Sequence, residues 1–386
     1  MSDSYEDFVH TGPDTLAGRF LRMFWQPVCV AEQLNAGQAL PVKVMSEEFT
    51  LYRGESGTPH LVSFRCAHRG AQLSAGWIEG DCIRCKYHGW KYDEHGQCVE
   101  QPGEEKSFST KVKISSYPIE EYYGLIFVYL GGGAPPPMRK FPDFEKPGLI
   151  SVGPPEVWPC NYFNRVDNAC DIGHVTFTHN ETLNRRFNQP EYFTIPELAA
   201  EETEYGIRTA VMRPDKPVNY FHFHMPNINQ APPSGRVETG IGEAQNLRAH
   251  RLFWRVPIDD EHCVSYVVSW LPLTGDAARE FEEKRQTLRS NLPVSPNELG
   301  EQVLKGKSRI RDVDKNLSQY YLFWLEDYVV QVGQGVVPER SNDRLGRMDV
   351  GVILLRKIWE RELRALAEGS RLKEWKSPEK PLVESK

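Results

Sequence analysis

The 386-residue sequence lacks the features of several protein classes. Its longest apolar stretches, at 124–130 and 350–355, fall far short of the roughly 18 residues that a membrane-spanning helix needs, so we expect no such helix. The N-terminus has neither the basic start nor the apolar stretch of a secretory signal, which favours a cytoplasmic protein. Lys and Arg total 46 against 53 Asp and Glu. This shortage of positive charge argues against nucleic-acid binding.

Cysteine is also scarce, with 8 in the whole chain. That number is too small for a disulfide scaffold, and the position of several cysteines beside histidines indicates metal binding instead. No G-x-G-x-x-G follows a predicted strand, and no plant-type C-x4-C-x2-C ferredoxin motif occurs. The sequence therefore encodes no nicotinamide or flavin site and no ferredoxin cluster of that type.

The chain divides into an all-β part and a mixed part. Short strands with hairpin turns run from Phe24 to about Leu130, and a Gly- and Pro-rich linker follows at 131–144. Strands at about 205–270 and helices at 164–175, 276–291, 313–332 and 342–368 then predict an α+β domain. We expect an N-terminal extension, two domains and a mobile tail, at 1–23, 24–150, 151–375 and 376–386.

The first candidate metal site lies in the β domain. Cys66 and His68 form a C-x-H pair, and Cys85 and His88 form a C-x2-H pair. Structural zinc would accept two Cys and two His, but this spacing favours a Rieske [2Fe–2S] centre, in which two thiolates hold one iron and two imidazoles the other. Two further cysteines, Cys82 and Cys98, are interpreted as small buried residues of the sheet.

The second candidate site lies in the α+β domain. On one helix, Asp167, Asp171 and His174 would share a face, and polar groups of this kind are costly to bury unless they pair or bind metal. His179 joins His174 at one ion only if the helix ends or kinks between them, which the run 175–178 makes plausible. Two histidines and a carboxylate form the facial triad of non-haem Fe(II) oxygenases. The strongest candidates for the third ligand are Asp327 and, more weakly, Glu326 and Asp314.

These motifs resemble the oxygenase (alpha) component of Rieske non-haem iron ring-hydroxylating oxygenases, in the phthalate dioxygenase-like branch. The resemblance implies a Rieske domain followed by a helix-grip-type catalytic domain with a twisted antiparallel sheet and helices. It also implies homotrimers in which His174, His179 and Asp327 bind Fe(II). Asp171 would couple the centres by contacting His174 and the partner subunit's His88. Asp167 takes a position that is often Asn in better-known members, which leaves its role open.

The expected activity is that of a terminal oxygenase. Electrons from NADH, delivered by a separate reductase or ferredoxin, would activate O2 for hydroxylation or oxidative O- or N-dealkylation of an aromatic substrate. Aromatic cis-dihydroxylation is the alternative within the family, and a Rieske electron-transfer protein or a zinc-stabilised binding protein are alternatives outside it. His222 and His224 alternate on a strand and therefore face the same side. Such a pair is more often a polar strand face, and contact with substrate or a metal is the alternative. The basic residues near the first site would steer an acidic donor or form the subunit contact, namely Arg69, Arg84, Lys86 and Lys91.

Overall fold

The computed structural model describes residues 7–186, 188, 194–234, 248–290, 295–313, 317 and 319–382. The chain folds into two compact units. The small unit comprises His10–Met138 and Val256–Asp259, and the large unit comprises the described parts of Met1–Val9, Arg139–Arg255 and Asp260–Lys386. The chain passes from one unit to the other between Met138 and Arg139, inside the Gly- and Pro-rich linker. None of the described helices is long and apolar enough to cross a membrane.

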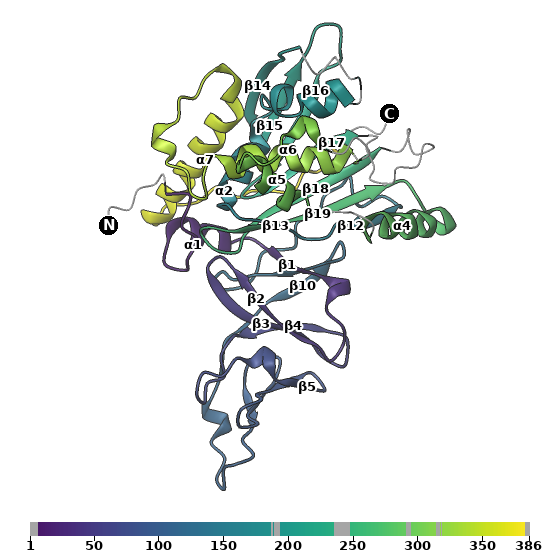
Figure 1. Ribbon diagram of the computed structural model, residues 1–386. Coiled ribbons are helices and arrows are strands. Elements are labelled where there is room, and N and C mark those ends of the chain that lie inside the picture. The colour runs from purple at the N-terminus through teal and green to yellow at the C-terminus, as the bar shows by residue number, and fades with distance from the viewer. Residues whose placement is uncertain are drawn as a thin grey trace. The chain divides into compact units, whose positions relative to one another are not determined.

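The small unit consists of three antiparallel sheets, visible in Figure 1 in purple and blue. The strands run in the orders β1-β11-β10, β2-β3-β4-β9 and β5-β6-β7-β8. The third sheet carries the hairpin between β6 and β7 that holds one predicted Cys–His pair. The elements are α1 (Leu16–Arg22), β1 (Gln26–Val30), β2 (Ala39–Val44), β3 (Glu47–Arg53), β4 (Pro59–Ser63), β5 (Trp77–Glu79), β6 (Cys82–Arg84), β7 (Lys91–Tyr92), β8 (Cys98–Glu100), β9 (Ser116–Tyr117), β10 (Ile119–Tyr122) and β11 (Leu125–Val128).

The large unit is built on one antiparallel sheet. Its order is β12-β19-β18-β17-β16-β15-β14, and β13 also pairs with β19. From β14 to β19 each strand pairs with the next one along the chain, an order that antiparallel strands can form without crossover helices. The strands are β12 (Leu149–Val152), β13 (Glu156–Trp158), β14 (Glu197–Glu202), β15 (Gly206–Met212), β16 (Asn219–His224), β17 (Ile228–Ser234), β18 (Ala249–Pro257) and β19 (Cys263–Leu271).

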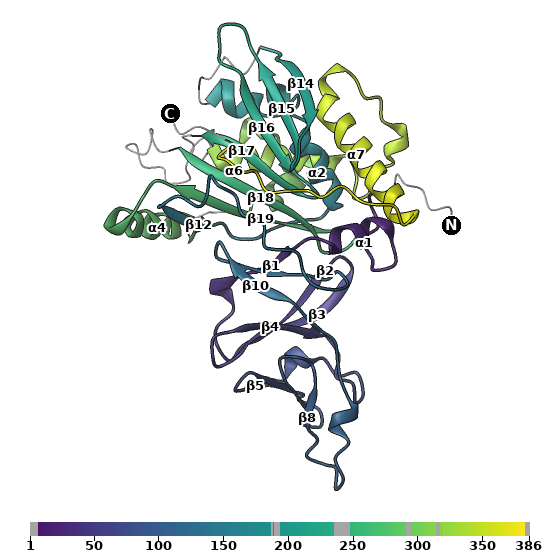
Figure 2. The same cartoon turned by 180° about the vertical axis from the view of Figure 1, so that it is seen from behind.

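Helices α2, α6 and α7 lie on one face of this sheet, as a comparison of Figure 1 and Figure 2 shows. Gly351 of α7 packs against the Cys170 carbonyl at the end of α2 and against Thr209 of β15. Helices α2 and α7 therefore lie on the face of the sheet to which the Thr209 side chain points. The helices of the large unit are α2 (Tyr162–Cys170), α3 (Val175–Thr178), α4 (Gly275–Ser290), α5 (Pro296–Leu304), α6 (Gln319–Gly333) and α7 (Val350–Ala367).

Two predicted helices begin later than the sequence pattern suggested. The helix predicted at 342–368 begins at Val350, because short 3₁₀ turns occupy Arg340–Asn342 and Arg347–Asp349. The helix predicted at 313–332 runs from Gln319 to Gly333, and residues 314–316 and 318 lie outside the described residues. Residues 342–349 therefore precede helix α7 and do not belong to it.

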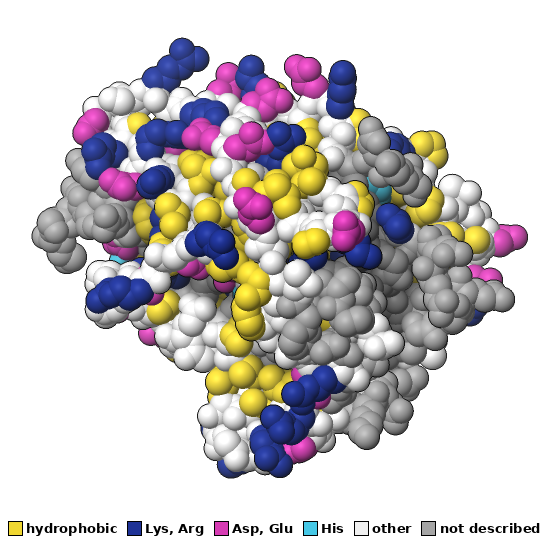
Figure 3. All heavy atoms as spheres, turned by 90° about the horizontal axis from the view of Figure 1, so that it is seen from above, with side chains coloured by type: hydrophobic (Ala, Val, Ile, Leu, Met, Phe, Trp, Pro, Cys, Tyr) yellow, Lys and Arg dark blue, Asp and Glu magenta, His cyan; other side chains and the backbone are white. Residues whose placement is uncertain are grey.

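Helix α7 shows how apolar spacing directs packing. Leu355, Ile358, Trp359 and Leu363 are buried and recur at the three- and four-residue intervals of one helix face. Burying an aliphatic side chain of this size stabilises the fold by roughly 1.5–3 kcal/mol. The polar face remains outside, and the surface visible in Figure 3 carries basic and acidic side chains interspersed over much of its area.

Candidate metal centres

Cys66 and Cys85 occupy equivalent turns of the small unit. Each cysteine carbonyl accepts a hydrogen bond from the amide of the glycine four residues later, Gly70 at 2.9 Å and Gly89 at 3.1 Å. These glycines have φ values of 71° and 74°, a conformation that residues with a Cβ rarely adopt. The Cys-x3-Gly spacing therefore closes each loop into a tight turn that carries a histidine.

The four predicted ligands of the first centre lie together. The thiols of Cys66 and Cys85 belong to one buried cluster, and the ring centroids of His68 and His88 are 4.5 Å apart. Burial raises the pKa of the Cys85 thiol, and the neighbouring Cys66 thiol raises it further. Nδ1 of His68 is buried with no hydrogen-bond partner among the described residues. Adjacent thiols and a buried imidazole nitrogen without a partner fit the ligand set of a Rieske [2Fe–2S] cluster.

The surroundings of this centre include residues that the sequence did not single out. His68 stacks on Trp90 with the rings 4.5 Å apart, and the Tyr92 hydroxyl lies 3.2 Å from Cys66 Sγ. A thiolate can only accept, so the Tyr92 O–H would donate to it. Hydrogen bonds to cluster sulfurs are among the factors that set a reduction potential. The Cys98 side chain lies in the same buried cluster, whereas Cys82 is half-buried at the start of β6.

The basic residues near the first centre fall into two kinds. Arg84 is buried and forms ion pairs with Glu79 and Glu100, and Lys91 pairs with the same two acids. Hydrogen bonds from Arg84 help to lower the pKa of both carboxyls to about 2. Arg84 and Lys91 are therefore neutralised within the unit. The two exposed cations are instead Arg69, over the Tyr87 ring, and Lys86, over the Trp77 ring.

In the large unit, the predicted helix over 164–175 is interrupted before His174. Helix α2 ends at Cys170, and Asp171 has non-helical backbone angles, φ −84° and ψ 82°. Its Oδ1 accepts the His174 N–H at 3.2 Å, which is how short acidic side chains compete with helical hydrogen bonds. The prediction that Asp167, Asp171 and His174 share one helix face is therefore wrong. The 175–178 run, expected to break the helix, forms α3, with His174 and His179 flanking it.

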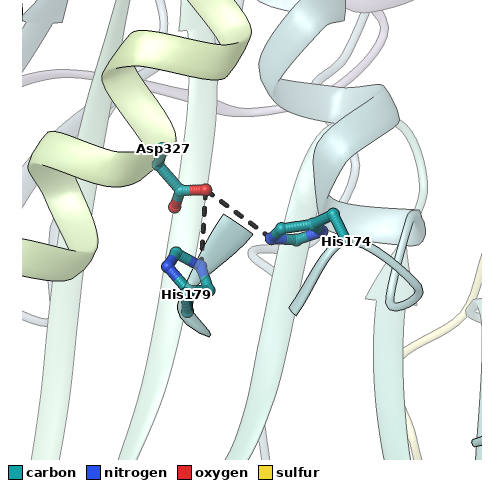
Figure 4. A group of neighbouring side chains, drawn as sticks. All are labelled: His174, His179 and Asp327. Carbon is teal, nitrogen blue, oxygen red and sulfur yellow. Dashed lines mark ion pairs between the residues drawn. The ribbon is translucent and has the colours of Figure 1, made fainter. Parts of the chain in front are cut away.

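His174, His179 and Asp327 converge, although the aspartate comes from α6 (Figure 4). Asp327 Oδ1 lies 3.6 Å from Nε2 of His174 and 3.6 Å from Nε2 of His179. One candidate ligand atom from each residue lies within 4.8 Å of the others. Burial raises the pKa of Asp327, but the two histidines lower it, and the net shift is downward. Two imidazoles and an ionised carboxylate fit a mononuclear Fe(II).

The outer nitrogens of the two histidines have different partners. Nδ1 of His174 contacts the backbone carbonyl of Asp171, and the Asn168 amide lies 3.4 Å from Nε2. Nδ1 of His179 lies 3.0 Å from Glu326 Oε2. Glu326 thus belongs to the site as a partner of His179, while Asp327 occupies the position between the histidines. Asp314, the other alternative ligand, lies outside the described residues.

The Asp171 carboxylate contacts the backbone of His174 and not its imidazole ring. The carboxylate accepts the backbone N–H, and Oδ2 is 4.0 Å from Nδ1 of the imidazole, too far for a hydrogen bond. The Asp171 side chain is 31% exposed, so its carboxylate is accessible from outside the chain. Burial raises the pKa of this carboxyl, and the His174 imidazole and amide counteract the rise.

Asp167 has a structural setting that answers part of the question left open by the sequence. Its Oδ2 accepts from Arg356 at 2.7 Å and from Arg340 at 3.1 Å. Arg340 also donates to Asn164 on α2, and Arg356 pairs with Asp343. Asp167 therefore ties the segment before α7 to helix α2.

His222 and His224 do not join the second centre. Both are buried. His222 pairs with Arg208 in the β15–β16 register, so the two side chains share a face of the sheet. Thr209 follows Arg208 and points to the opposite face, while His224 points to the same face as His222. Tyr205 Oη lies 2.8 Å from Nδ1 of His222, and Nε2 of His224 lies 3.0 Å from Gln230 Oε1. Their partners and their face of the sheet agree with a polar strand face, because helices α2 and α7 lie on the other face.

Two protein families match the chain. Residues 24–118 match the Rieske [2Fe-2S] domain, and residues 158–274 match the vanillate O-demethylase oxygenase C-terminal domain. The chain belongs to the Rieske oxygenases. The predicted fold class, an all-β Rieske domain followed by an antiparallel sheet with helices, is confirmed.

Named relatives of this Rieske oxygenase are oxygenase subunits. The 5,5'-dehydrodivanillate O-demethylase oxygenase subunit of Sphingobium sp. (strain NBRC 103272 / SYK-6) is 26% identical over 383 residues, which cover 95% of this chain and 81% of the relative. The phthalate 4,5-dioxygenase oxygenase subunit of Pseudomonas putida is 25% identical over 385 residues, covering 92% and 84%. The reduced complex between oxygenase and ferredoxin in carbazole 1,9a-dioxygenase contains a chain with a similar fold, at a TM-score of 0.63 and 18% identity, covering 96% and 98%.

These findings fix the class of the protein. This Rieske oxygenase is an oxidoreductase whose cofactors are a [2Fe–2S] cluster and a mononuclear iron. The sequence motifs predicted the family and the three residues that converge. They did not point to Asn168, to Tyr92 or to the contact between Glu326 and His179. The signal for Glu326 was present, since a second acid directly before Asp327 in an apolar helix also needs a partner.

Proposed function

We propose that the protein is a terminal oxygenase that hydroxylates, or oxidatively O- or N-dealkylates, a small aromatic substrate with electrons that originate from NADH. In this proposal, residues 24–150 hold the cluster through Cys66, His68, Cys85 and His88. Residues 151–375 hold Fe(II) through His174, His179 and Asp327. The observation that carries the proposal is the convergence of this triad, because an electron-transfer Rieske protein has no use for it.

The chain's own residues supply position and charge. When bound, the cluster supplies single electrons and the iron activates O2, which is the chemistry of the cofactors. The nearly buried triad, with His174 and Asp327 14% and 21% exposed at their side chains, provides a sheltered place for that chemistry. His174, His179 and Asp327 would be the protein ligands of this iron. Asp327 contributes the negative charge that favours a divalent cation.

The preference for dealkylation over dihydroxylation rests on the match to the vanillate O-demethylase C-terminal domain and on the O-demethylase relative. The phthalate relative keeps cis-dihydroxylation as the alternative, because its name is that of a dioxygenase. We expect the protein in the cytoplasm, where NADH is available to a reductase or ferredoxin partner.

We further propose that three copies assemble into a ring in which Asp171 of one subunit contacts His88 of the next. A head-to-tail contact that closes on itself gives every cluster a neighbouring iron. Native mass spectrometry of the loaded protein should give a mass of three chains, or a multiple of three. An active monomer would contradict this arrangement.

A substrate panel tests the proposed activity. The purified oxygenase, with a surrogate reductase and NADH, should release formaldehyde from aryl methyl ethers or N-methyl amides and consume O2 in proportion. Formation of cis-diols from aromatic acids would favour dihydroxylation instead. Cluster reduction and reoxidation without product from any aromatic compound would favour pure electron transfer.

A further inference from the structure

His179 lies between two carboxylates of helix α6. Its Nε2 is 3.6 Å from Asp327 Oδ1, and its Nδ1 is 3.0 Å from Glu326 Oε2. Both side chains of the outer contact are almost fully buried, His179 at 3% and Glu326 at 1% exposure. Consecutive residues of one helix therefore contact opposite sides of the same imidazole, which fixes the ring in orientation.

The Glu326 carboxylate is held by a second donor. Its Oε1 accepts the backbone N–H of Thr182 at 3.1 Å, three residues after His179. When Glu326 is ionised, both of its carboxylate oxygens only accept, so Nδ1 of His179 carries the hydrogen in this contact. The neutral ring then has its lone pair on Nε2, the nitrogen that faces Asp327 and His174. Carboxylates that accept from a metal-binding histidine in this way fix its tautomer and raise its basicity.

The two histidines differ in this respect. His174 has its Nδ1 against a neutral peptide carbonyl, whereas His179 has its Nδ1 against an ionisable acid. Among the described residues, the ion pair of Glu326 is with His179. A carboxylate buried to this degree requires compensating charge. A divalent cation on Nε2 would provide it through the imidazole, and Glu326 and Asp327 together would balance its two positive charges.

We propose that Glu326 is a positioning residue for the mononuclear metal, acting through His179 by holding it in the Nδ1–H tautomer. The inference rests on the proposed function, because it takes His174, His179 and Asp327 as the ligands. Glu326 itself touches neither the metal nor the substrate in this arrangement. Its contribution is to fix the orientation of the His179 ring, with Nδ1 toward Glu326 and Nε2 toward the other two ligands.

Substitution of Glu326 by Gln and by Ala separates this role from packing. In Glu326→Gln the Oε1 atom can still accept from Thr182, but the amide NH2 then faces Nδ1 and favours the tautomer with hydrogen on Nε2. Glu326→Ala leaves His179 free to choose either tautomer but creates a cavity. Tautomer control therefore predicts that Gln harms metal binding more than Ala. Packing alone predicts the opposite order.

The readout is metal affinity. Protein loaded with the oxidised [2Fe–2S] cluster and stripped of mononuclear metal is dialysed to equilibrium against Co²⁺. We expect Glu326→Gln to bind about 10- to 100-fold more weakly than wild type, with Glu326→Ala in between. The matched control is Glu301→Gln. Glu301 lies on α5 and accepts a hydrogen bond from Tyr328 of α6 at 3.0 Å, but it is not among the triad residues. It should bind like wild type, and the cluster absorption should be unchanged in all variants.

The outcomes distinguish the two proposals. If Asp327→Ala loses Co²⁺ but Glu326→Gln binds as tightly as wild type or Glu326→Ala, the role of Glu326 is refuted and the ligand assignment stands. If Asp327→Ala binds like wild type, the ligand assignment fails and the role of Glu326 fails with it. Proton NMR of the Co²⁺-loaded wild type needs no variant. It should show two shifted histidine N–H signals protected from solvent exchange, one from His174 and one from His179, and absence of the His179 signal would also refute the role of Glu326.

Discussion

The two candidate metal centres are built in opposite ways. In the small unit, all four ligands come from two short turns of similar design, each closed by a glycine with positive φ. In the large unit, two ligands flank the short helix α3, and the third, Asp327, lies on α6. Asp327 directly follows Glu326, which is 147 residues after His179 in the chain. The first centre depends on local turn chemistry, whereas the second depends on the packing of α3 against α6.

The largest expected effect comes from removing one centre while keeping the other. Asp327→Ala should abolish binding of the mononuclear iron and turnover, because the lost carboxylate is the only acid of the triad. Cys66→Ser should have the reciprocal result, with the cluster absorption lost and Co²⁺ binding to the large unit retained. Metal analysis and the visible spectrum measure both.

Joint loss of both metals in either variant would contradict this independence. Retention of iron and activity in Asp327→Ala would refute the ligand assignment itself. An exposed acid serves as the matched control, since Asp312→Ala changes an ion pair with Arg309 at the surface and should leave both metals bound.

The same contrast explains how far the sequence could be interpreted. The spacing of Cys66, His68, Cys85 and His88 is local, so it predicts the ligand set without knowledge of the fold. His174 and His179 are also close in sequence, but the helix break was predicted in the wrong place, because the side chain of Asp171 competes for the backbone N–H of His174. Helical periodicity contains no information about such a competition.

Tertiary partners were the part that could not be derived. An acid in an otherwise apolar helix is a candidate ligand, and this criterion applies to Glu326 as well as to Asp327. Only the packing of α6 against α3 decides that one acid faces Nε2 of both histidines and the other faces Nδ1 of His179. In the same way, the partners of Asp167 lie 173 and 189 residues away.

The second prediction concerns communication between the centres. Asp171→Asn should leave both metals bound, because an Asn oxygen can still accept the His174 N–H that Asp171 Oδ1 accepts now. It replaces the carboxylate with a neutral amide, so a bridge to the partner subunit's His88 would lose its charge-assisted acceptor. We expect electron transfer to slow by about 100-fold, equivalent to about 2.7 kcal/mol.

Single-turnover oxidation of the prereduced cluster, followed optically with substrate and O2, measures this step. A wild-type rate in Asp171→Asn would mean that Asp171 only ends helix α2. Slow transfer accompanied by loss of iron would place the defect at the mononuclear site instead, so iron content is measured on the same sample.

The third prediction tests the attachment of the segment before α7. Asp167→Asn weakens the contacts to Arg340 and Arg356, whose side chains are 13% and 18% exposed. Loss of one partner from a largely buried charge cluster should lower the free energy of unfolding by about 2–3 kcal/mol, less than for a fully buried pair. Urea denaturation measures the change. Asp276→Asn, at an exposed pair with Arg279, is the matched control and should cost less than about 0.5 kcal/mol. Equal effects of the two substitutions would contradict the prediction.

The smallest expected effect concerns His222, a buried histidine on the sheet face opposite the candidate metal ligands. Burial lowers the pKa of His222 from an ordinary value near 6.5 to about 4. Between these values the unfolded chain binds a proton that the folded chain does not, so the free energy of unfolding falls as the pH is lowered. From pH 7 to pH 5 this residue alone should cost about 2 kcal/mol.

His222→Gln isolates that contribution, because Gln can still accept from Tyr205 but does not titrate. The loss of stability between pH 7 and pH 5 should be about 2 kcal/mol smaller in this variant than in wild type, as measured by urea denaturation at both values. His262→Gln removes an exposed histidine of the same unit and should keep the wild-type dependence. If His222→Gln loses as much stability as wild type, the neutral form of His222 is not what the folded unit selects. The acid sensitivity would then come from other groups, such as His224 or His250, whose pKa values burial also lowers.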